Sequence, residues 1–183
     1  MISSSEVKKG LTLDIEGEPY TVLDWQHVCK ARESANIRLK LRHLRTGETI
    51  ERTLDAGHKF RAVPVDRRPV TFLYMDGEFY YFMDTGTQDE IITPAEMLGE
   101  GRKYIVDNLQ LDLLLLNGEP VAVDLPESVV MRVNETEMPK VGTASHYKHI
   151  KTETGLVVLA PQFISPGDRI RVNTTKGEYM GRV

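Results

Sequence analysis

Three groups of side chains in this sequence carry residue types that could do covalent or metal chemistry. Asp84-Thr85-Gly86 is the triplet with which aspartic proteases hold paired carboxylates around one shared proton. One copy is present, so such a hydrolase would need a homodimer. His27 and Cys29 stand two apart, hence on one face of a strand, and His146 and His149 could offer imidazoles to a metal.

None of these groups forms a complete catalytic or metal centre. A thiolate nucleophile needs a lowered pKa and an oxyanion site, which the sequence does not show around Cys29. No carboxylate or thiol stands at ligand spacing beside the histidines, and no phosphate-cradling Gly-rich loop or dinucleotide fingerprint occurs. We therefore predict a binding protein with no metal and no cofactor, and keep a dimeric aspartic hydrolase using Asp84 as an alternative.

The residues best suited to hold a partner lie in 28–44. Apolar Ile37, Leu39, Leu41 and Leu44 alternate there with basic Arg38, Lys40 and Arg42. This period of two predicts a β-hairpin with one apolar and one cationic face, and residues 29–35 form its tip. Basic side chains on one ribbon release counterions when laid along a polynucleotide, so we predict contact with RNA phosphates.

Composition and charge narrow the class of protein. The chain has 183 residues, a net charge of −4 and a single cysteine, which excludes an internal disulfide and fits a reducing compartment. Apolar stretches such as residues 113–116 are too short to cross a bilayer. We expect a soluble cytoplasmic protein without membrane contact.

The charge is unevenly distributed along the chain. Residues 1–63 carry 11 basic and 9 acidic side chains, residues 64–127 carry 4 and 13, and residues 128–183 carry 8 and 5. This asymmetry suggests that the basic ends touch a polyanion while the acidic middle faces something else. Solvated faces without a partner are the alternative reading of the same charges.

Strand and turn signals predict three small β units. In residues 1–64 we expect five strands, at 11–13, 18–25, the two arms of the hairpin, and 48–54. In residues 65–127, Asp76-Gly77 and Asn117-Gly118 each mark a hairpin, the aromatics at 74 and 79–82 are expected mainly in the core, and Thr93 is expected to cap a short helix. An oligonucleotide-binding (OB) barrel would show this pattern.

The last unit, residues 128–183, is predicted to hold strands at 129–134, 156–160, 169–173 and 178–183. A long loop at 137–153 separates the first two. It carries Lys140, Lys148 and Lys151, which we predict to contact an anionic partner such as rRNA. A mobile solvated loop is the alternative.

The order of short motifs along the chain resembles that of the bacterial elongation factor P family. The matching segments are Lys9-Gly10, Gly17-Glu18-Pro19-Tyr20, residues 38–47, residues 74–79, Asn117-Gly118, Leu125-Pro126, residues 154–158, Pro166-Gly167-Asp168 and residues 175–179. The resemblance implies an L-shaped, all-β protein with an SH3-like (KOW-like) N-terminal domain and two OB domains. It implies a translation factor that binds the 70S ribosome between the P and E sites, contacts peptidyl-tRNA in the P site, and relieves stalling at polyproline.

Within this resemblance, Arg32 falls at the tip position that many family members modify. An arginine there implies a subgroup in which a glycosyltransferase adds rhamnose to the guanidinium, and Lys30 is the alternative acceptor. The sequence departs from the family pattern in having Ala31 and Glu33 beside the tip residue, and in having no Asp in residues 141–145. A paralogous factor of the same family, or a general RNA-binding β-barrel protein, is the alternative reading.

Overall fold

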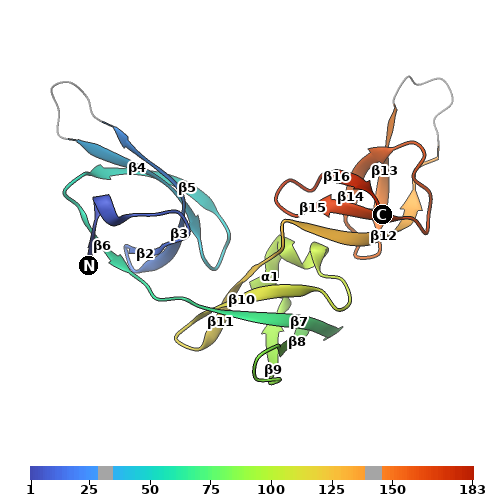
Figure 1. The fold of residues 1–183 in the computed structure, drawn as a ribbon, viewed down its shortest axis with the longest axis horizontal. Helices are drawn as coiled ribbons and strands as arrows, with labels where there is room; N and C mark the ends of the chain where they lie inside the picture. Colours follow the sequence, from blue (N-terminus) through green and yellow to red (C-terminus); the bar gives the residue numbers. More distant parts are fainter. Residues whose placement is uncertain (29–34, 139–145) are drawn as a thin grey trace. The chain divides into compact units, whose positions relative to one another are not determined.

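The computed structural model describes residues 1–28, 35–138 and 146–183. Regular structure in these ranges is mostly β-strand, arranged in three sheets (Figure 1). The chain divides into two compact units, residues 1–67 with 114–122, and residues 68–113 with 123–183. Across the described ranges, no helix has both the length and the apolar character needed to span a membrane. The prediction of an all-β fold is confirmed.

The first sheet has six strands in the order β1-β6-β2-β3-β4-β5. Alternation in the sequence explains its core, because every second residue of a strand points inward. Seven buried side chains fill that core: Val7, Leu13, Val22, Ile37, Leu39, Leu41 and Phe60. The strands are β1 (Ile2–Ser3), β2 (Thr12–Ile15), β3 (Glu18–Val28), β4 (Asn36–His43), β5 (Thr49–Asp55) and β6 (Lys59–Ala62), with a 3-10 turn η1 (Ser4–Glu6).

The hairpin predicted for residues 28–44 differs from the one observed. In the observed hairpin the first arm is the long strand β3, which runs from Glu18 to Val28. The strand predicted at 18–25 and the predicted first arm of the hairpin are therefore one strand. β4 pairs with β3 on one side and with β5 on the other along its whole length, so the described arm is three-stranded. The register of β3 shifts between Val22 and Asp24, which leaves Leu23 as the extra residue of a β-bulge.

The middle sheet has five strands in the order β11-β10-β7-β8-β9. Both hairpin dipeptides are confirmed: Gly77, Asn117 and Gly118 all have positive φ, as tight turns between paired strands require. The elements are β7 (Asp66–Asp76), β8 (Phe79–Asp84), β9 (Glu90–Pro94), α1 (Ala95–Leu98), the 3-10 helix η2 (Gly99–Tyr104), β10 (Gln110–Leu116) and β11 (Glu119–Asp124).

The predicted helix cap at Thr93 is wrong. Strand β9 runs through Pro94, and Pro94 itself is the first residue before helix α1. Thr93 is fully buried, and its hydroxyl oxygen has no hydrogen-bond partner among the described residues. Pairing with Tyr80 on β8 therefore decided the conformation of this segment, in place of local capping chemistry.

The third sheet has five strands in the order β14-β13-β12-β15-β16. The predicted loop at 137–153 is wrong in its second half, because Tyr147–Thr152 forms strand β13 between β12 and β14. Residues 139–145 lie outside the described structure. The strands are β12 (Ser128–Thr136), β13 (Tyr147–Thr152), β14 (Val157–Pro161), β15 (Arg169–Asn173) and β16 (Tyr179–Arg182).

Candidate nucleic-acid interface

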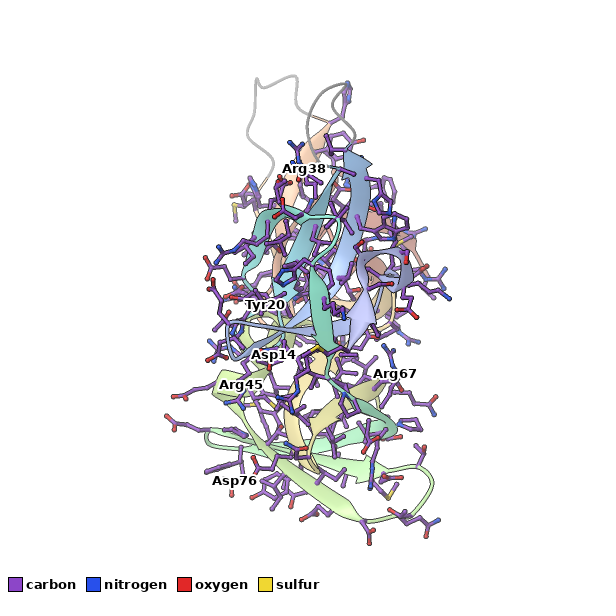
Figure 2. All side chains as sticks on the ribbon, turned by 90° about the vertical axis from the view of Figure 1, so that its left-hand side faces the viewer. Asp14, Tyr20, Arg38, Arg45, Arg67 and Asp76 are labelled. Carbon is purple, nitrogen blue, oxygen red and sulfur yellow. The ribbon has the colours of Figure 1, made fainter. Side chains whose placement is uncertain are left out.

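The outward face of β4 carries the basic residues predicted for RNA binding. Ile37, Leu39 and Leu41 are completely buried, whereas Arg38, Lys40 and Arg42 are exposed on the opposite face. The strict alternation read from the sequence is therefore confirmed. Figure 2 labels Arg38 on this strand.

The strands on either side of β4 decide how cationic this face is. Lys40 lies directly between Asp24 on β3 and Glu51 on β5, so two carboxylates neighbour one ammonium group. Arg38 lies between Gln26 and Thr53, which are both uncharged. Arg42 likewise lies between two uncharged residues, Thr21 and Thr49. The face is therefore nearly neutral around Lys40 and positive on both sides of it, at Arg42 and at Arg38, which lies toward the end of the arm that leads to residues 29–34.

Asp24 holds a further basic residue at the edge of this face. Its Oδ1 lies 3.2 Å from Nζ of Lys9 and accepts the Trp25 backbone N–H at 3.0 Å. The hydrogen bond from Lys9, followed by the one from Trp25 and by the charges of Lys9 and Lys40, lowers the pKa of the Asp24 carboxyl. Asp24 is thus ionised at neutral pH and reduces the attraction of Lys9 and Lys40 for phosphate.

The tip residues Arg32 and Lys30 lie outside the described residues, as does Cys29. The structure describes the two strand ends that bracket them, since Val28 pairs with Asn36 and Asn36 pairs with Asp55. The backbone N–H of Ala56 also donates to the carbonyl of Ala35 at 2.8 Å. The residues that flank this segment on both sides therefore have hydrogen-bonded backbone.

His43 is a structural residue of this sheet that the sequence did not indicate. Its Nδ1 accepts the backbone N–H groups of Arg45 and Thr46 at 3.2 and 3.1 Å, so the proton of the neutral ring is on Nε2, 3.3 Å from Oε2 of Glu18. The ring also meets Tyr20 edge to face, with centroids 4.9 Å apart. His43 thereby fixes the turn between β4 and β5.

The predicted basic residues of the third sheet do not share one face. Lys148 and Lys151 are three apart on β13 and thus point to opposite sides of it. Lys151 is exposed between Glu135 and Val157, while Lys148 is half-buried opposite Ala160. Lys140 lies outside the described residues. A joint phosphate contact by Lys148 and Lys151 is not supported by this placement.

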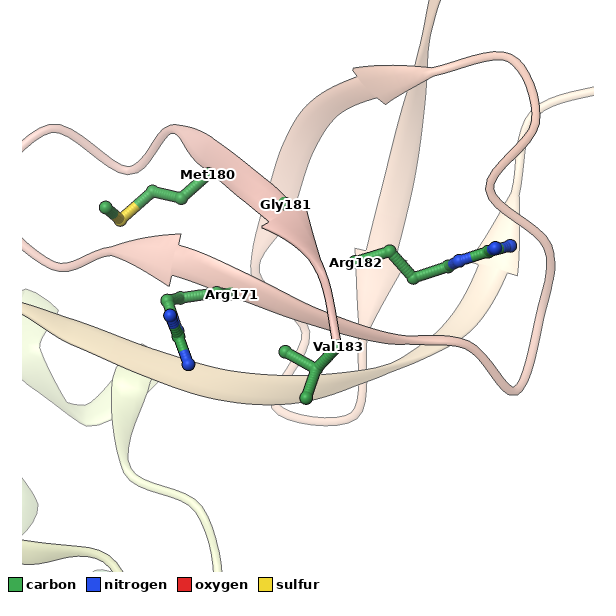
Figure 3. A pocket seen from close by; sticks show the side chains of 5 residues that line it. All are labelled: Arg171, Met180, Gly181, Arg182 and Val183. Atoms are coloured by element: carbon green, nitrogen blue, oxygen red, sulfur yellow. The ribbon is translucent and has the colours of Figure 1, made fainter.

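A second basic group, which the sequence reading missed, lies on β12 and β15. Arg132 is directly opposite Arg169, and Arg171 follows two residues along β15, so all three are on one face. They are exposed, although Arg132 and Arg169 share a hollow of about 410 Å³ with Asp107 and Glu153. Arg171 lines a smaller hollow of about 200 Å³ with Met180, Gly181, Arg182 and Val183 (Figure 3). The alternation in residues 169–173 was the available signal.

Asp84 has a structural environment unlike that of a catalytic dyad. It is 4% exposed, and its Oδ1 accepts the backbone N–H groups of Gly86 and Thr87 at 2.8 and 3.0 Å. These bonds, from Thr87 and then Gly86, together with the nearby Arg68, lower the pKa of the carboxyl. The triplet thus closes the turn between β8 and β9, and its carboxylate is unsuited to sharing a proton with a second copy.

The histidines give no metal centre in the described ranges. His149 Nδ1 lies 3.3 Å from Oε2 of Glu137, and His27 contacts Trp25 edge to face at 5.1 Å. No group of three His, Cys, Asp or Glu side chains placed to hold a metal occurs among the residues that the structure describes.

Comparison with known proteins matches the whole length of the chain. Three family models match in succession: the elongation factor P KOW-like domain at residues 3–60, the elongation factor P OB domain at 65–123, and the elongation factor P C-terminal domain at 129–182. The chain belongs to the elongation factor P family. The resemblance inferred from the motifs is confirmed, as is the all-β fold class with KOW-like and OB domains.

Individual relatives within the family agree with this assignment. The chain is 41% identical to elongation factor P of Moorella thermoacetica over 184 residues and 40% identical to that of Pelotomaculum thermopropionicum over 185, each match covering both chains completely. Elongation factor P of Leifsonia xyli is 36% identical over 185 residues. Among solved structures, a translation initiation factor 5A from Methanococcus jannaschii shares the fold, with a TM-score of 0.50 and 19% identity over 67% of this chain and 92% of that one.

Proposed function

We propose that this protein is a translation elongation factor that binds the 70S ribosome between the P and E sites and stimulates peptide-bond formation at polyproline stretches. The observation that carries the proposal is the three-stranded arm β3–β4–β5, whose exposed face is basic at Arg42 and at Arg38, toward the end that leads to the segment holding Arg32. Membership of the elongation factor P family supports it.

The mechanism we propose is positioning, without an acid or base from the protein. Proline is a hindered partner in peptide-bond formation, and a factor that holds the acceptor end of the peptidyl-tRNA in a reactive geometry lowers the entropic part of the barrier. A paired sheet suits this task because its strands cannot bend independently. Arg32 would contact ribose or phosphate of the tRNA end, and Arg38 and Arg42 would hold the arm on the RNA backbone.

The side chain of Arg32 is proposed to act either directly or after modification. Transfer of rhamnose to its guanidinium by a glycosyltransferase, from a nucleotide-sugar donor with release of the nucleoside diphosphate and a proton, would add hydroxyl groups that hydrogen-bond RNA while the charge is kept. Lys30 is the alternative acceptor. Intact mass measurement of the native protein, followed by peptide mapping, tests this. A deoxyhexose on Arg32 would support the proposed modification. An unmodified tip would overturn the modification and leave the proposed positioning role unaffected.

The function is tested by reconstituted translation of a reporter with consecutive prolines. Arg32→Ala is expected to abolish relief of stalling, while ribosome binding falls by less than about tenfold because the rest of the arm remains. Arg61→Ala, an exposed arginine on the short strand β6, is the matched control and is expected to behave like the unaltered protein. Full relief of stalling by Arg32→Ala would overturn the proposed role of the tip. A protein that binds RNA but leaves stalling unchanged would be a general RNA-binding barrel.

A further inference from the structure

The outward face of the middle sheet has a composition unlike that of an ordinary solvated surface. Phe79, Tyr81 and Met83 on β8 point to this side, because the alternate residues Tyr80 and Phe82 are buried in the core. Tyr74 on β7 and Ile92 on β9 stand directly opposite Tyr81 on its two sides. We call these five residues, Tyr74, Phe79, Tyr81, Met83 and Ile92, the aromatic face.

The aromatic face is both exposed and ordered. Tyr74, Phe79 and Ile92 are 49%, 49% and 51% exposed, and Met83 is 36% exposed. The rings of Tyr74 and Tyr81 stack at 4.4 Å between centroids with 13° between their planes, so the centre of the face is flat and fixed. Large apolar side chains that are left in water across three neighbouring strands mark a contact surface in soluble proteins.

Acidic residues surround this face. Asp76 lies opposite Phe79, and Glu90 lies opposite Met83, while Glu78 precedes β8. Partial removal from water, with the nearby charges of Glu90 and Asp76, raises the pKa of the Tyr74 hydroxyl, which agrees with carboxylates close to the stacked rings. The segment 64–127 as a whole carries 13 acidic and 4 basic residues.

This charge pattern selects the kind of partner. A polynucleotide would be repelled by the carboxylates, although aromatic rings alone would suit base stacking. A second copy of the same face would bring carboxylates against carboxylates, which opposes a symmetric dimer. A protein surface with apolar side chains among Lys and Arg complements both the rings and the rim.

We propose that the aromatic face docks a basic protein of the ribosome, and that the protein therefore contacts ribosomal protein with its middle sheet while the β4 face contacts RNA. This inference rests on the proposed ribosome binding. It assigns a role to the acidic third of the chain, which the RNA-binding role of the arm leaves unexplained. Aromatic residues at the centre of such a surface are expected to supply most of its affinity.

Photo-crosslinking within the complex tests the proposal. A p-benzoyl-phenylalanine residue replaces Ile92 in one variant, Leu159 in a second and Gln26 in a third. Leu159 is the matched control, since it is an exposed aliphatic residue on β14, 53% exposed, outside the aromatic face. Gln26 lies on the face of β3 next to Arg38 and reports whether the arm meets RNA. Each variant is irradiated on purified 70S ribosomes carrying peptidyl-tRNA.

The expected result is an adduct from position 92 that resists ribonuclease and contains a ribosomal protein of high isoelectric point, together with an RNA adduct from position 26. Position 159 is expected to give no adduct with that ribosomal protein. Three results at position 92 would overturn the proposal: an adduct with RNA, an adduct with a second copy of this chain, or no adduct. In each of these cases, an RNA adduct from position 26 would leave the proposed function intact. Absence of adducts from both positions would overturn both.

Affinity measurements give an independent readout. The double variant Phe79→Ser, Ile92→Thr is expected to weaken ribosome binding about tenfold, whereas Val157→Thr, Leu159→Thr on β14 leaves it unchanged. Glu90→Lys tests the rim and is expected to weaken binding several-fold, more so at low salt. Equal affinity of the double variant and the unaltered protein would overturn the proposal. All of these side chains are exposed or half-exposed, and circular dichroism checks that each variant folds.

Discussion

The outer faces of the first and middle sheets are built alike and carry opposite chemistry. Each is centred on a strand between two neighbours, β4 in one and β8 in the other, and in each every second residue is buried. On β4 the outward residues are Arg38, Lys40 and Arg42, and on β8 they are Phe79, Tyr81 and Met83. The β pattern thus fixes which residues face out, and residue type alone decides what each face can bind.

The largest expected effect separates the inner from the outer face of β4. Leu39→Ala should lower the free energy of unfolding by about 2–5 kcal/mol, because Leu39 is completely buried and its loss leaves a cavity. Arg38→Ala, its neighbour on the exposed side, should change it by less than about 0.5 kcal/mol. Urea titration followed by circular dichroism measures both. Similar losses in the two variants would contradict the assignment of faces.

The next effect distinguishes residues within the basic face. Arg38→Ala should weaken binding to RNA about tenfold and reduce the slope of log affinity against log salt by about one, as loss of one phosphate contact does. Lys40→Ala should do less, because Asp24 and Glu51 beside it already offset its charge. Binding to a labelled tRNA at several salt concentrations measures this. Equal losses would mean that the carboxylates do not screen Lys40.

Buried hydroxyl groups provide a smaller contrast between the two sheets. In the first, Ser4 donates to the carbonyl of Ala56, and Thr12 lies 3.4 Å from the hydroxyl of Thr21. In the middle sheet, the hydroxyl oxygen of Thr93 has no hydrogen-bond partner among the described residues. Thr93→Val keeps the shape and removes the unpaired hydroxyl, so it should raise the unfolding free energy by about 1 kcal/mol. Thr12→Val, the matched control, should not be stabilising. Thermal melting compares them.

The smallest expected effect concerns acid stability. The folded state lowers the pKa of Asp84 below 3.8, so the unfolded chain binds its proton first as pH falls. The stabilisation of the folded state by ionised Asp84 is present above about pH 4, and it is lost as the pH falls through the lower pKa that Asp84 has in the folded state. Asp84→Asn retains an oxygen for Gly86 and Thr87, and should flatten the fall in melting temperature between about pH 4 and 2. An unchanged acid profile would show that Asp84 gains nothing from ionisation.

The sequence predicted those parts of the fold that local patterns determine. Residues 36–42 alternate without interruption, and Asn117-Gly118 suits a turn that needs positive φ, so both were predicted correctly. Strand β13 was missed because Ile150 is its only buried apolar residue, its other buried position being Thr152. Strand β6 was missed because it has four residues, of which only Phe60 is buried.

The sequence predicted which strand carries the basic residues of the candidate site, but it did not predict which residues of the adjacent strands lie beside them. Residue types showed that Arg38, Lys40 and Arg42 share a face, but the cross-strand pairs that place Asp24 and Glu51 beside Lys40 depend on register. The same holds for Arg132 and Arg169, which are 37 positions apart in sequence and adjacent in the sheet. Pairing between distant strands is set by tertiary packing, which one sequence does not display.

The bulge at Leu23 has a consequence for evolution by insertion and deletion. Leu23 is the extra residue of β3, so without it Asp24 would follow Val22 directly and would still lie opposite Lys40. Loss of this one position leaves Gln26 beside Arg38 on the basic face. Loss of Gln26 itself would instead bring His27 opposite Arg38 and turn it to that face. The bulge is thus the point in β3 where one codon can be lost while both the strand pairing and the two faces of the arm are kept.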